Sequence, residues 1–285
     1  MGDSEVAALE ELRPLVFSIA YRMLGSVAEA EDVVQKALLR MHTSAPEDVR
    51  SAEAYASVVT TRLAIDALRS ARRRREQYLG PWLPEPLVDS GEADPAWRLE
   101  MDETVSTAFL VLLESLSPVE RAVFVLREVF SYRYAEVAAV VGKSETACRQ
   151  VFHRAQGRLH DRRTRFEPSA AERDRLAGRF FAAVREGDLA GLEAVLADEV
   201  VFYGDGGGKA PAVRRPVRGR VQVARFILGL ARQMGRVGFR LAPVRVNGQP
   251  ARSSPRRTVA SWACSRWESA TAVSSPSTTR STPTN

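Results

Sequence analysis

Hydrophobic residues recur at helical spacing through the first 165 residues of this chain of 285. The first apolar stripe consists of Leu9, Leu12, Val16, Ile19 and Met23. Residues three and four positions apart share a helical face, so this stripe predicts a helix. Similar stripes predict a second helix between the Gly-Ser pair at 25–26 and residue 43, a third over about 52–75, and four more between residues 99 and 160.

The pattern changes after the Pro-Ser pair at 168–169. Helical spacing continues over 171–186, 189–196 and 221–234, but segments 199–203 and 237–246 are typical of strands. This half is therefore predicted to be an α+β domain. From residue 251 onward the chain holds nine serines and six threonines with little periodicity, which predicts a disordered tail over 251–285.

A proline-rich segment separates two parts of the helical half. Residues 80–95 contain four prolines and two glycines, so no regular helix can continue through them. We interpret this segment as a linker. It also carries apolar side chains on a stiff proline frame, which could dock against another surface.

The segment from 117 to 160 has the pattern of a helix-turn-helix. Ser117, Pro118 and Glu120 form a capping box with proline at the first helical position. The tripeptide at 142–144 begins with glycine and predicts a tight turn before a helix over 145–160. Apolar residues of that last helix recur on one face at Cys148, Val151, Phe152, Ala155 and Leu159.

The opposite face of the last helix is polar and could donate hydrogen bonds to base edges and phosphates in a major groove. Its members are Ser144, Glu145, Thr146, Arg149, Gln150, His153 and Arg154. A second group, Arg69 with the run Arg72 to Arg75, ends the predicted helix over 52–75 and could neutralise phosphate charge. Either basic face could instead be simply solvated, but together they favour nucleic-acid binding.

The formal charge of +6 conceals a strong asymmetry. Residues 1–205 carry 26 basic and 34 acidic side chains, whereas residues 206–285 carry 15 basic and one acidic. Enzyme chemistry is weakly represented, because all three histidines precede residue 161 and the two cysteines form no metal-binding spacing. The glycine-rich segment at 205–209 lacks the spacing of a nucleotide-binding loop. We expect no enzyme activity, no metal and no cofactor.

No run of about 18 uncharged apolar residues occurs, and the N-terminus is acidic instead of resembling a signal peptide. We therefore expect no membrane insertion and a cytoplasmic location.

Three motifs resemble the bacterial sigma factors of the extracytoplasmic-function (ECF) group. They are Ala-Glu-Asp-Val-Val-Gln at 30–35, Thr-Arg-Leu-Ala-Ile-Asp-Ala-Leu-Arg at 61–69, and the segment from 136 to 150. The linker motif Gly-Pro-Trp-Leu-Pro-Glu-Pro at 80–86 and Asp-Gly-Gly-Gly-Lys at 205–209 resemble the subgroup with a fused SnoaL-like C-terminal domain. The chain differs from the family pattern at Lys36, where an acidic residue is common.

The resemblance implies an architecture of all-α sigma region 2 and region 4 modules followed by an incomplete α+β SnoaL-like domain. It implies a sigma region 2 over 5–78, a linker over 79–98, region 4 over 99–165 and a SnoaL-like domain over 169–250. The implied function is promoter recognition and transcription initiation, with activity tuned by the fused domain. Implied partners are promoter DNA and the β′ coiled coil and β flap of the RNA polymerase core, without a membrane or a separate anti-sigma factor.

Site residues follow from the same resemblance. Contacts to the polymerase core are expected from Asp32, Gln35, Leu38 and Arg40. Contacts to the −10 element are expected from Arg62, Asp66, Arg69, Arg72 and Arg73, and contacts to the −35 element from the polar face of the 145–160 helix. Regulatory contacts between linker and fused domain are expected from Trp82, Leu83, Pro84, Asp205, Gly207 and Lys209.

The tail departs from this family, which normally ends in strands and an Asn-Pro-Asp-Lys segment. Read one nucleotide earlier, GC-rich codons after about Glu268 can encode Asp-Gly-Arg-Val-Val-Ala-Val and then Val-Asn-Pro-Asp-Lys. We hypothesise that the tail is out of frame, which independent sequencing of the gene tests. Without those strands the sheet would have an unpaired edge and an open core.

Two other functions stay open from sequence. A conventional helix-turn-helix regulator that senses a small molecule in its C-terminal domain would bind promoters without polymerase. A SnoaL-like enzyme would turn over a substrate with residues 169–250 alone, although that segment contains no histidine.

Overall fold

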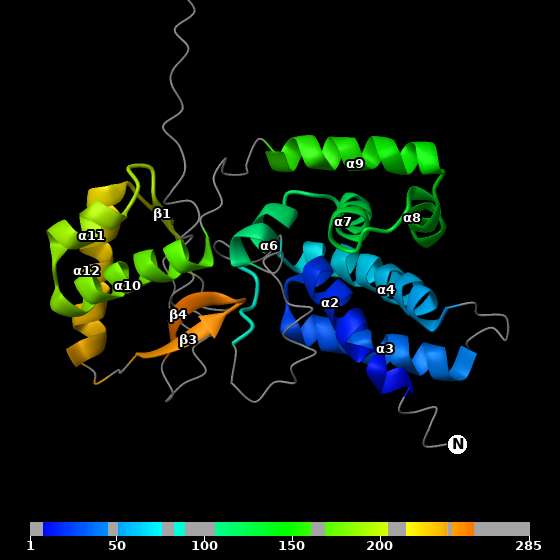
Figure 1. Cartoon of the computed structure of the whole chain (residues 1–285), viewed down its shortest axis with the longest axis horizontal. Coiled ribbons are helices and arrows are strands. Elements are labelled where there is room, and N and C mark those ends of the chain that lie inside the picture. The colour runs from blue at the N-terminus through cyan, green and yellow to red at the C-terminus, as the bar shows by residue number, and fades with distance from the viewer. Residues whose placement is uncertain are drawn as a thin grey trace, which may run out of the picture.

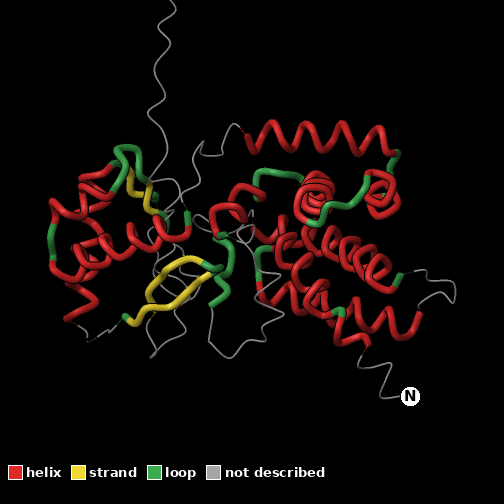
Figure 2. The backbone as a smooth tube through the Cα atoms, viewed as in Figure 1, coloured by secondary structure: helices red, strands yellow, loops and turns green. Residues whose placement is uncertain are grey.

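The computed structural model describes residues 8–44, 51–75, 83–88, 106–160, 169–204, 215–236, 238 and 241–253. These residues form a large helical body and a smaller domain that combines helices with short strands (Figure 1). The helices of the helical body lie between residues 13 and 160, and the helices and strands of the C-terminal domain lie between residues 170 and 253. Among these described residues, strands occur only in the C-terminal domain, apart from one isolated bridge to the linker (Figure 2).

Three helices form the first part of the helical body, as the apolar stripes predict. They are α2 (Arg13–Leu24), α3 (Val27–Ser44) and α4 (Ala52–Arg75). Helix α2 is central, since every residue from 16 to 24 is buried. It ends at Gly25, whose φ of 66° allows its N–H to reach the carbonyl of Tyr21.

The second part of the helical body confirms the predicted helix-turn-helix. The Ser117 hydroxyl accepts the Glu120 amide and the Glu120 carboxylate accepts the Ser117 amide, which completes the capping box. Gly142 adopts a φ of 66° in the turn before the last helix, and the predicted apolar stripe of that helix is buried. The elements are α6 (Thr107–Leu113), α7 (Pro118–Phe124), the π-helical turn η2 (Val125–Val129), α8 (Tyr134–Val141) and α9 (Glu145–His160).

The two parts of the helical body share one hydrophobic core. Phe124 lies near its centre, with ring centroids 6.3 Å from Phe109 and 5.8 Å from Phe152. The buried Arg121 guanidinium crosses between the parts, donating to the carbonyl of Met23 at 2.7 Å and to Glu114 at 2.9 Å. The two modules, which the sequence predicts as separate units joined by a linker, are therefore packed together as one body.

The C-terminal domain has the helices and strands that the pattern predicts, with different boundaries. The predicted strand over 237–246 begins only at Ala242, and a further strand extends to Ser253, beyond the predicted domain end at 250. Ala251 lies opposite Val244 in that strand and is buried, so the tail begins later than its composition predicts. The elements are α10 (Ala170–Glu186), α11 (Leu189–Val195), β1 (Val201–Phe202), β2 (Val217–Arg218), α12 (Arg220–Arg236), β3 (Ala242–Val246) and β4 (Gln249–Ser253).

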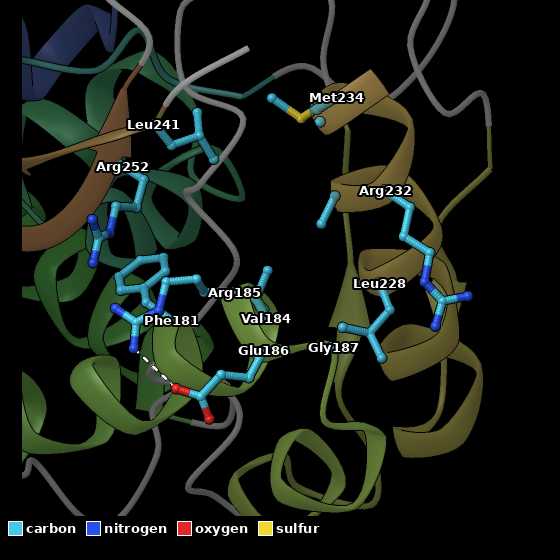
Figure 3. Close-up of a pocket in the computed structure, with 12 residues that line it drawn as sticks. Phe181, Val184, Arg185, Glu186, Gly187, Leu228, Arg232, Met234, Leu241 and Arg252 are labelled. Atoms are coloured by element: carbon cyan, nitrogen blue, oxygen red, sulfur yellow. Dashed lines mark hydrogen bonds and ion pairs between the residues drawn. The ribbon is translucent and has the colours of Figure 1, made fainter. Parts of the chain in front are cut away.

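The described strands form two separate antiparallel pairs, β1 with β2 and β3 with β4, instead of one sheet. The small core joins α10, α11 and α12 with β1. A cavity of about 570 Å³ lies between α10, α12 and β4 (Figure 3). Its lining combines apolar side chains such as Phe181, Leu228 and Leu241 with charged ones such as Arg232 and Arg252. Residues 254–285, which hold the rest of the predicted tail, lie outside the described residues.

Within the described ranges, every helix is too short or too polar to cross a membrane.

Candidate nucleic-acid interface

Helix α9 presents the predicted polar face to solvent. Glu145, Thr146, Arg149, Gln150, His153 and Arg154 are all exposed, opposite the buried stripe. Ser144 stands at the start of the helix, where its hydroxyl accepts the amide of Ala147 at 3.2 Å. The helix therefore brings this predicted set together, with Ser144 acting as its N-cap.

Tyr134 organises the N-terminal end of this face. Its ring lies beneath the guanidinium groups of Arg127 and Arg149, at 5.0 and 4.9 Å, and meets the ring of Phe152 edge-on. Arg149 also pairs with Glu145 at 3.0 Å. The sequence analysis missed Tyr134 and Arg127 as supports of Arg149, because this contact depends on how α8 packs across α9.

Helix α9 is also fixed to α7 by charge. Glu120 accepts Arg158 at 3.0 Å as well as closing the capping box. Burial opposes ionisation of this carboxyl, but hydrogen bonds from Ser117 and the positive charges of Arg158 and Arg154 lower its pKa overall.

Cys148, on the buried stripe of α9, offers no reactive thiol. Burial raises the pKa of this thiol, which disfavours the thiolate that metal binding and nucleophilic chemistry require. No group of three or more His, Cys, Asp or Glu side chains suited to a metal ion occurs among the described residues.

The residues predicted to contact the −10 element do not all present free side chains to solvent. Arg62 is exposed, yet its guanidinium donates to the carbonyls of Val140 at 3.0 Å and Ala139 at 2.8 Å. These carbonyls end helix α8, where cations are favoured because the last carbonyls lack helical partners. Arg62 therefore joins the two parts of the helical body.

Further along α4, Asp66 and Arg69 form an exposed pair at 3.2 Å. Arg72 and Arg73 lie in the last turn of the helix, and their side chains are outside the described part. The predicted cluster is therefore described only in part.

The predicted polymerase-binding residues lie along α3. Asp32, Gln35 and Arg40 are exposed, whereas Leu38 is half-buried against the core. The neighbouring Leu39 is 61% exposed, so it is the more accessible apolar side chain of this surface. The sequence analysis missed it, because a one-residue difference in helical phase depends on the packing of α3 against α2 and α4.

The linker contacts the C-terminal domain through Leu87 and Val88, which are not among the predicted residues. Leu83 and Pro84 are described, with Pro84 buried, but Trp82, Asp205, Gly207 and Lys209 lie outside the described residues. Glu85 anchors the linker instead. Its amide donates to the carbonyl of Gly25 at 2.7 Å, and its carboxylate accepts the amide of Val27 at 2.8 Å at the start of α3.

Asn247 connects the linker, α2 and the C-terminal domain. Its amide side chain accepts the Leu87 N–H at 2.8 Å and donates to the Tyr21 hydroxyl at 2.9 Å, and its own N–H donates to the Leu87 carbonyl at 2.9 Å. Tyr21 in turn donates to the carbonyl of Glu85 at 2.6 Å. Val88 extends the contact by bridging to Val246. We call these residues the Asn247 junction.

Asn247 is 7% exposed and adopts a φ of 51° in the turn between β3 and β4. The Asn-Gly pair at 247–248 is a sequence signal for such a turn. The contact across 226 residues to Tyr21 has no sequence signal, so the analysis of motifs missed it.

Three families match consecutive parts of the chain. Residues 8–74 match sigma-70 region 2, residues 106–159 match sigma-70 region 4, and residues 177–282 match the SnoaL-like domain.

Relatives from Mycobacterium tuberculosis (strain ATCC 25618 / H37Rv) extend over most of the chain. The ECF RNA polymerase sigma factor SigJ is 43% identical over 235 residues, covering 81% of this chain and 74% of its own length. The ECF RNA polymerase sigma factor SigG is 30% identical over 278 residues, covering 86% and 71%. The crystal structure of M. tuberculosis SigJ superimposes with a TM-score of 0.72 at 37% identity, covering 87% of this chain and 84% of that one. This chain belongs to the ECF RNA polymerase sigma factors and combines sigma-70 regions 2 and 4 with a SnoaL-like domain.

Proposed function

We propose that this sigma factor, which directs promoter recognition and transcription initiation, is held in a closed form by contacts between its own modules. The single observation that carries the proposal is the engagement of Arg62 by α8, since a predicted −10 residue is thereby tied to region 4. The Asn247 junction supports it from the other side of the molecule.

In the open form, α9 reads the −35 element and α4 holds the −10 element. Arginine and glutamine side chains recognise base edges in the major groove, and the α9 face displays Arg149, Gln150 and Arg154 for that purpose. Arg62, Asp66, Arg69, Arg72 and Arg73 act at the −10 element, with the arginines neutralising phosphates.

Geometry favours a separation of the two modules on DNA. The −10 and −35 elements lie about 25 base pairs apart, or about 85 Å at 3.4 Å per base pair. Regions 2 and 4 share one core here, and Arg62 links them directly. Opening frees Arg62 and exposes apolar surface of both modules, which polymerase then covers.

The surface of α3 made by Asp32, Gln35, Arg40 and the two leucines at 38–39 binds the β′ coiled coil of the polymerase core. Its exposed apolar and polar side chains fit a helical partner. Region 4 binds the β flap through surface that opening uncovers.

The SnoaL-like domain acts as a regulatory domain and not as an enzyme, taking the place of a separate anti-sigma factor. Asn247 holds the linker segment 83–88 against α2, so movement of the linker requires these hydrogen bonds to break. The predicted contacts of Trp82, Leu83, Pro84, Asp205, Gly207 and Lys209 belong to the same linker-to-domain interface.

Run-off transcription with purified core polymerase on the DNA upstream of the gene tests this function. Full-length protein is expected to initiate, and Asn247→Ala to initiate several-fold more. The substitution removes the two side-chain hydrogen bonds of Asn247. Each is worth about 1 kcal/mol, so their loss shifts the closed-to-open ratio by about five- to thirtyfold. Gln233→Ala, at an exposed position of α12, is the control in the same domain.

Three results contradict the proposal. Equal transcription with Asn247→Ala and the control rejects the junction as a restraint. Promoter binding without any need for core polymerase supports a conventional regulator. Stable capture of a separate inhibitory protein that blocks initiation rejects regulation by the fused domain alone.

A further inference from the structure

The C-terminal domain has a charge pattern that neither regulation nor promoter recognition by regions 2 and 4 requires. Residues 206–250 hold ten basic side chains and no acidic one. Helix α12 lies within this segment and contains four arginines and no aspartate or glutamate. This concentration of positive charge stands apart from the N-terminal 205 residues, in which acidic residues outnumber basic ones.

Three of these arginines share one exposed face of α12. Arg225, Arg232 and Arg236 are exposed, while the opposite face buries Val223 and Ile227 in the domain core. Spacings of seven and four residues place the three arginines within about 40° of one another around the helix axis, over a length of about 16 Å at 1.5 Å per residue. We call them the α12 arginine stripe.

The stripe is uncompensated by acidic neighbours. Arg220, at the start of the same helix, pairs with Asp198 at 2.9 Å, and Arg245 pairs with Asp174 at 2.8 Å. Across the residues that the structure describes, the three stripe arginines form no ion pair or hydrogen bond. Arg232 extends away from Phe181 and Arg252 on the other side of the cavity (Figure 3).

Several other surface arginines among the described residues pair with a carboxylate. Arg69 lies beside Asp66, Arg149 beside Glu145, and Arg185 beside Glu186. Helix α10 alternates its arginines with acidic residues, so its surface is close to neutral. The α12 arginine stripe, by contrast, lies on a helix that contains no acidic residue, and it fits a partner with regularly spaced negative charge.

Connectivity keeps the stripe near the DNA that α9 binds. Eight residues separate His160, the end of α9, from Ser169, the N-cap of α10. At about 3.3–3.6 Å per residue this segment spans at most about 30 Å, so the domain stays within reach of the same duplex. Tethering raises the effective concentration of a weak second site.

We propose that the α12 arginine stripe binds the phosphate backbone of duplex DNA next to the site held by α9, as a third and sequence-independent DNA contact of this sigma factor. Guanidinium groups bind phosphate oxygens through charge-assisted hydrogen bonds and release counterions. The inference rests on the proposed role of α9, since α9 delivers the domain to the duplex.

Holoenzyme binding to promoter duplexes across a KCl series tests the stripe. The variant carries Arg225→Gln, Arg232→Gln and Arg236→Gln. The charge-matched control carries Arg175→Gln, Arg179→Gln and Arg185→Gln on α10. Loss of three phosphate contacts is expected to raise Kd about tenfold or more near 0.1 M salt and to reduce the slope of log K against log salt by up to about 2.7. The control is expected to bind like the unaltered protein.

A second duplex with a scrambled −35 element separates this inference from the function of α9. If α9 does not read sequence, the unaltered protein binds both duplexes equally. If the stripe contacts backbone, the stripe variant loses the same factor on both. An unchanged salt slope in the stripe variant overturns the proposal, as does a loss of affinity for core polymerase measured without DNA, which would assign the stripe to a protein partner.

A triple lysine variant distinguishes the loss of phosphate contacts from a loss of folding. Arg225→Lys, Arg232→Lys and Arg236→Lys preserve the charge, so this variant is expected to keep the salt slope of the unaltered protein. Loss of the slope in both the lysine and glutamine variants, with a lowered thermal midpoint, overturns the proposal in favour of a structural role for α12.

Discussion

Among the described residues, the helical body and the C-terminal domain differ in how many large side chains they bury completely. Of the twelve largest side chains with less than 2% exposure among the described residues, eleven belong to the helical body and only Leu192 belongs to the C-terminal domain. The described strands of the C-terminal domain form two separate pairs beside a cavity of about 570 Å³. Among the described residues, the large and fully buried side chains are therefore concentrated in the helical body.

This difference shows where regulation can act at low energetic cost. Apolar packing across the shared core resists separation of regions 2 and 4, since each buried large side chain stabilises by about 1.5–3 kcal/mol. The described linker segment is attached to the C-terminal domain chiefly through the polar contacts of the Asn247 junction. Net hydrogen-bond energies of about 1 kcal/mol make such contacts reversible.

Replacing one buried phenylalanine in each region by alanine is expected to reveal the largest difference in stability between the two regions. Phe124→Ala removes a ring that contacts two others at the centre of the shared core, and should cost about 3–5 kcal/mol. Phe180→Ala should cost less, about 3 kcal/mol, because the smaller core around it can relax further into the space. Hydrogen exchange by mass spectrometry measures both regions separately; equal losses of protection would show that the two are packed alike.

Arg62→Ala tests the contact between the two parts of the helical body. Two hydrogen bonds from a charged donor to α8 are lost, and exposure of Arg62 limits the cost to about 1–3 kcal/mol. The open fraction should rise about five- to 150-fold, observed by energy transfer between dyes on α3 and α9. Arg69→Ala removes an exposed ion pair of the same helix and serves as the control. An equal effect of Arg69→Ala would mean that Arg62 does not hold the closed form.

Two capping boxes of the same type, one in each region, allow a comparison in which the expected losses of stability are smallest. Ser117 with Glu120 begins α7, and Ser169 with Glu172 begins α10. Ser117→Ala should destabilise the helical body by about 1 kcal/mol. Ser169→Ala should affect only the start of α10, because that box lies at the surface of the domain.

The Ser117–Glu120 capping box also predicts that the stability of the protein depends on pH. The pKa of Glu120 is lowered from its ordinary 4.5, so its contribution is complete above that pH and is lost as pH falls through the lower folded-state pKa. Thermal midpoints of Glu120→Gln should therefore converge with those of the unaltered protein at acidic pH and fall below them near neutrality. A constant difference across the range would contradict the role of ionised Glu120.

Local features of this fold were predictable because their determinants lie within a few residues. The Ser117 capping box, the turn at Gly142 and the buried stripe of α9 each depend on one turn or one helix period. The exposed polar face of α9 follows from the same periodicity. The three sequence motifs indicated the family for a related reason, since they occupy contiguous segments.

Contacts between distant segments were decided by tertiary structure. The sequence by itself determined which residues form helices, which face of α9 is buried, and where charge gathers on α12. Only packing determined that Arg62 would donate to the carbonyls at the end of α8 and that Leu39 instead of Leu38 would be exposed. Packing also determined that Asn247 would form a hydrogen bond with Tyr21. The physical reason is that helix periodicity and capping are short-range properties, whereas these contacts depend on the orientation of whole helices and of a hairpin that the shared core and the linker bring together.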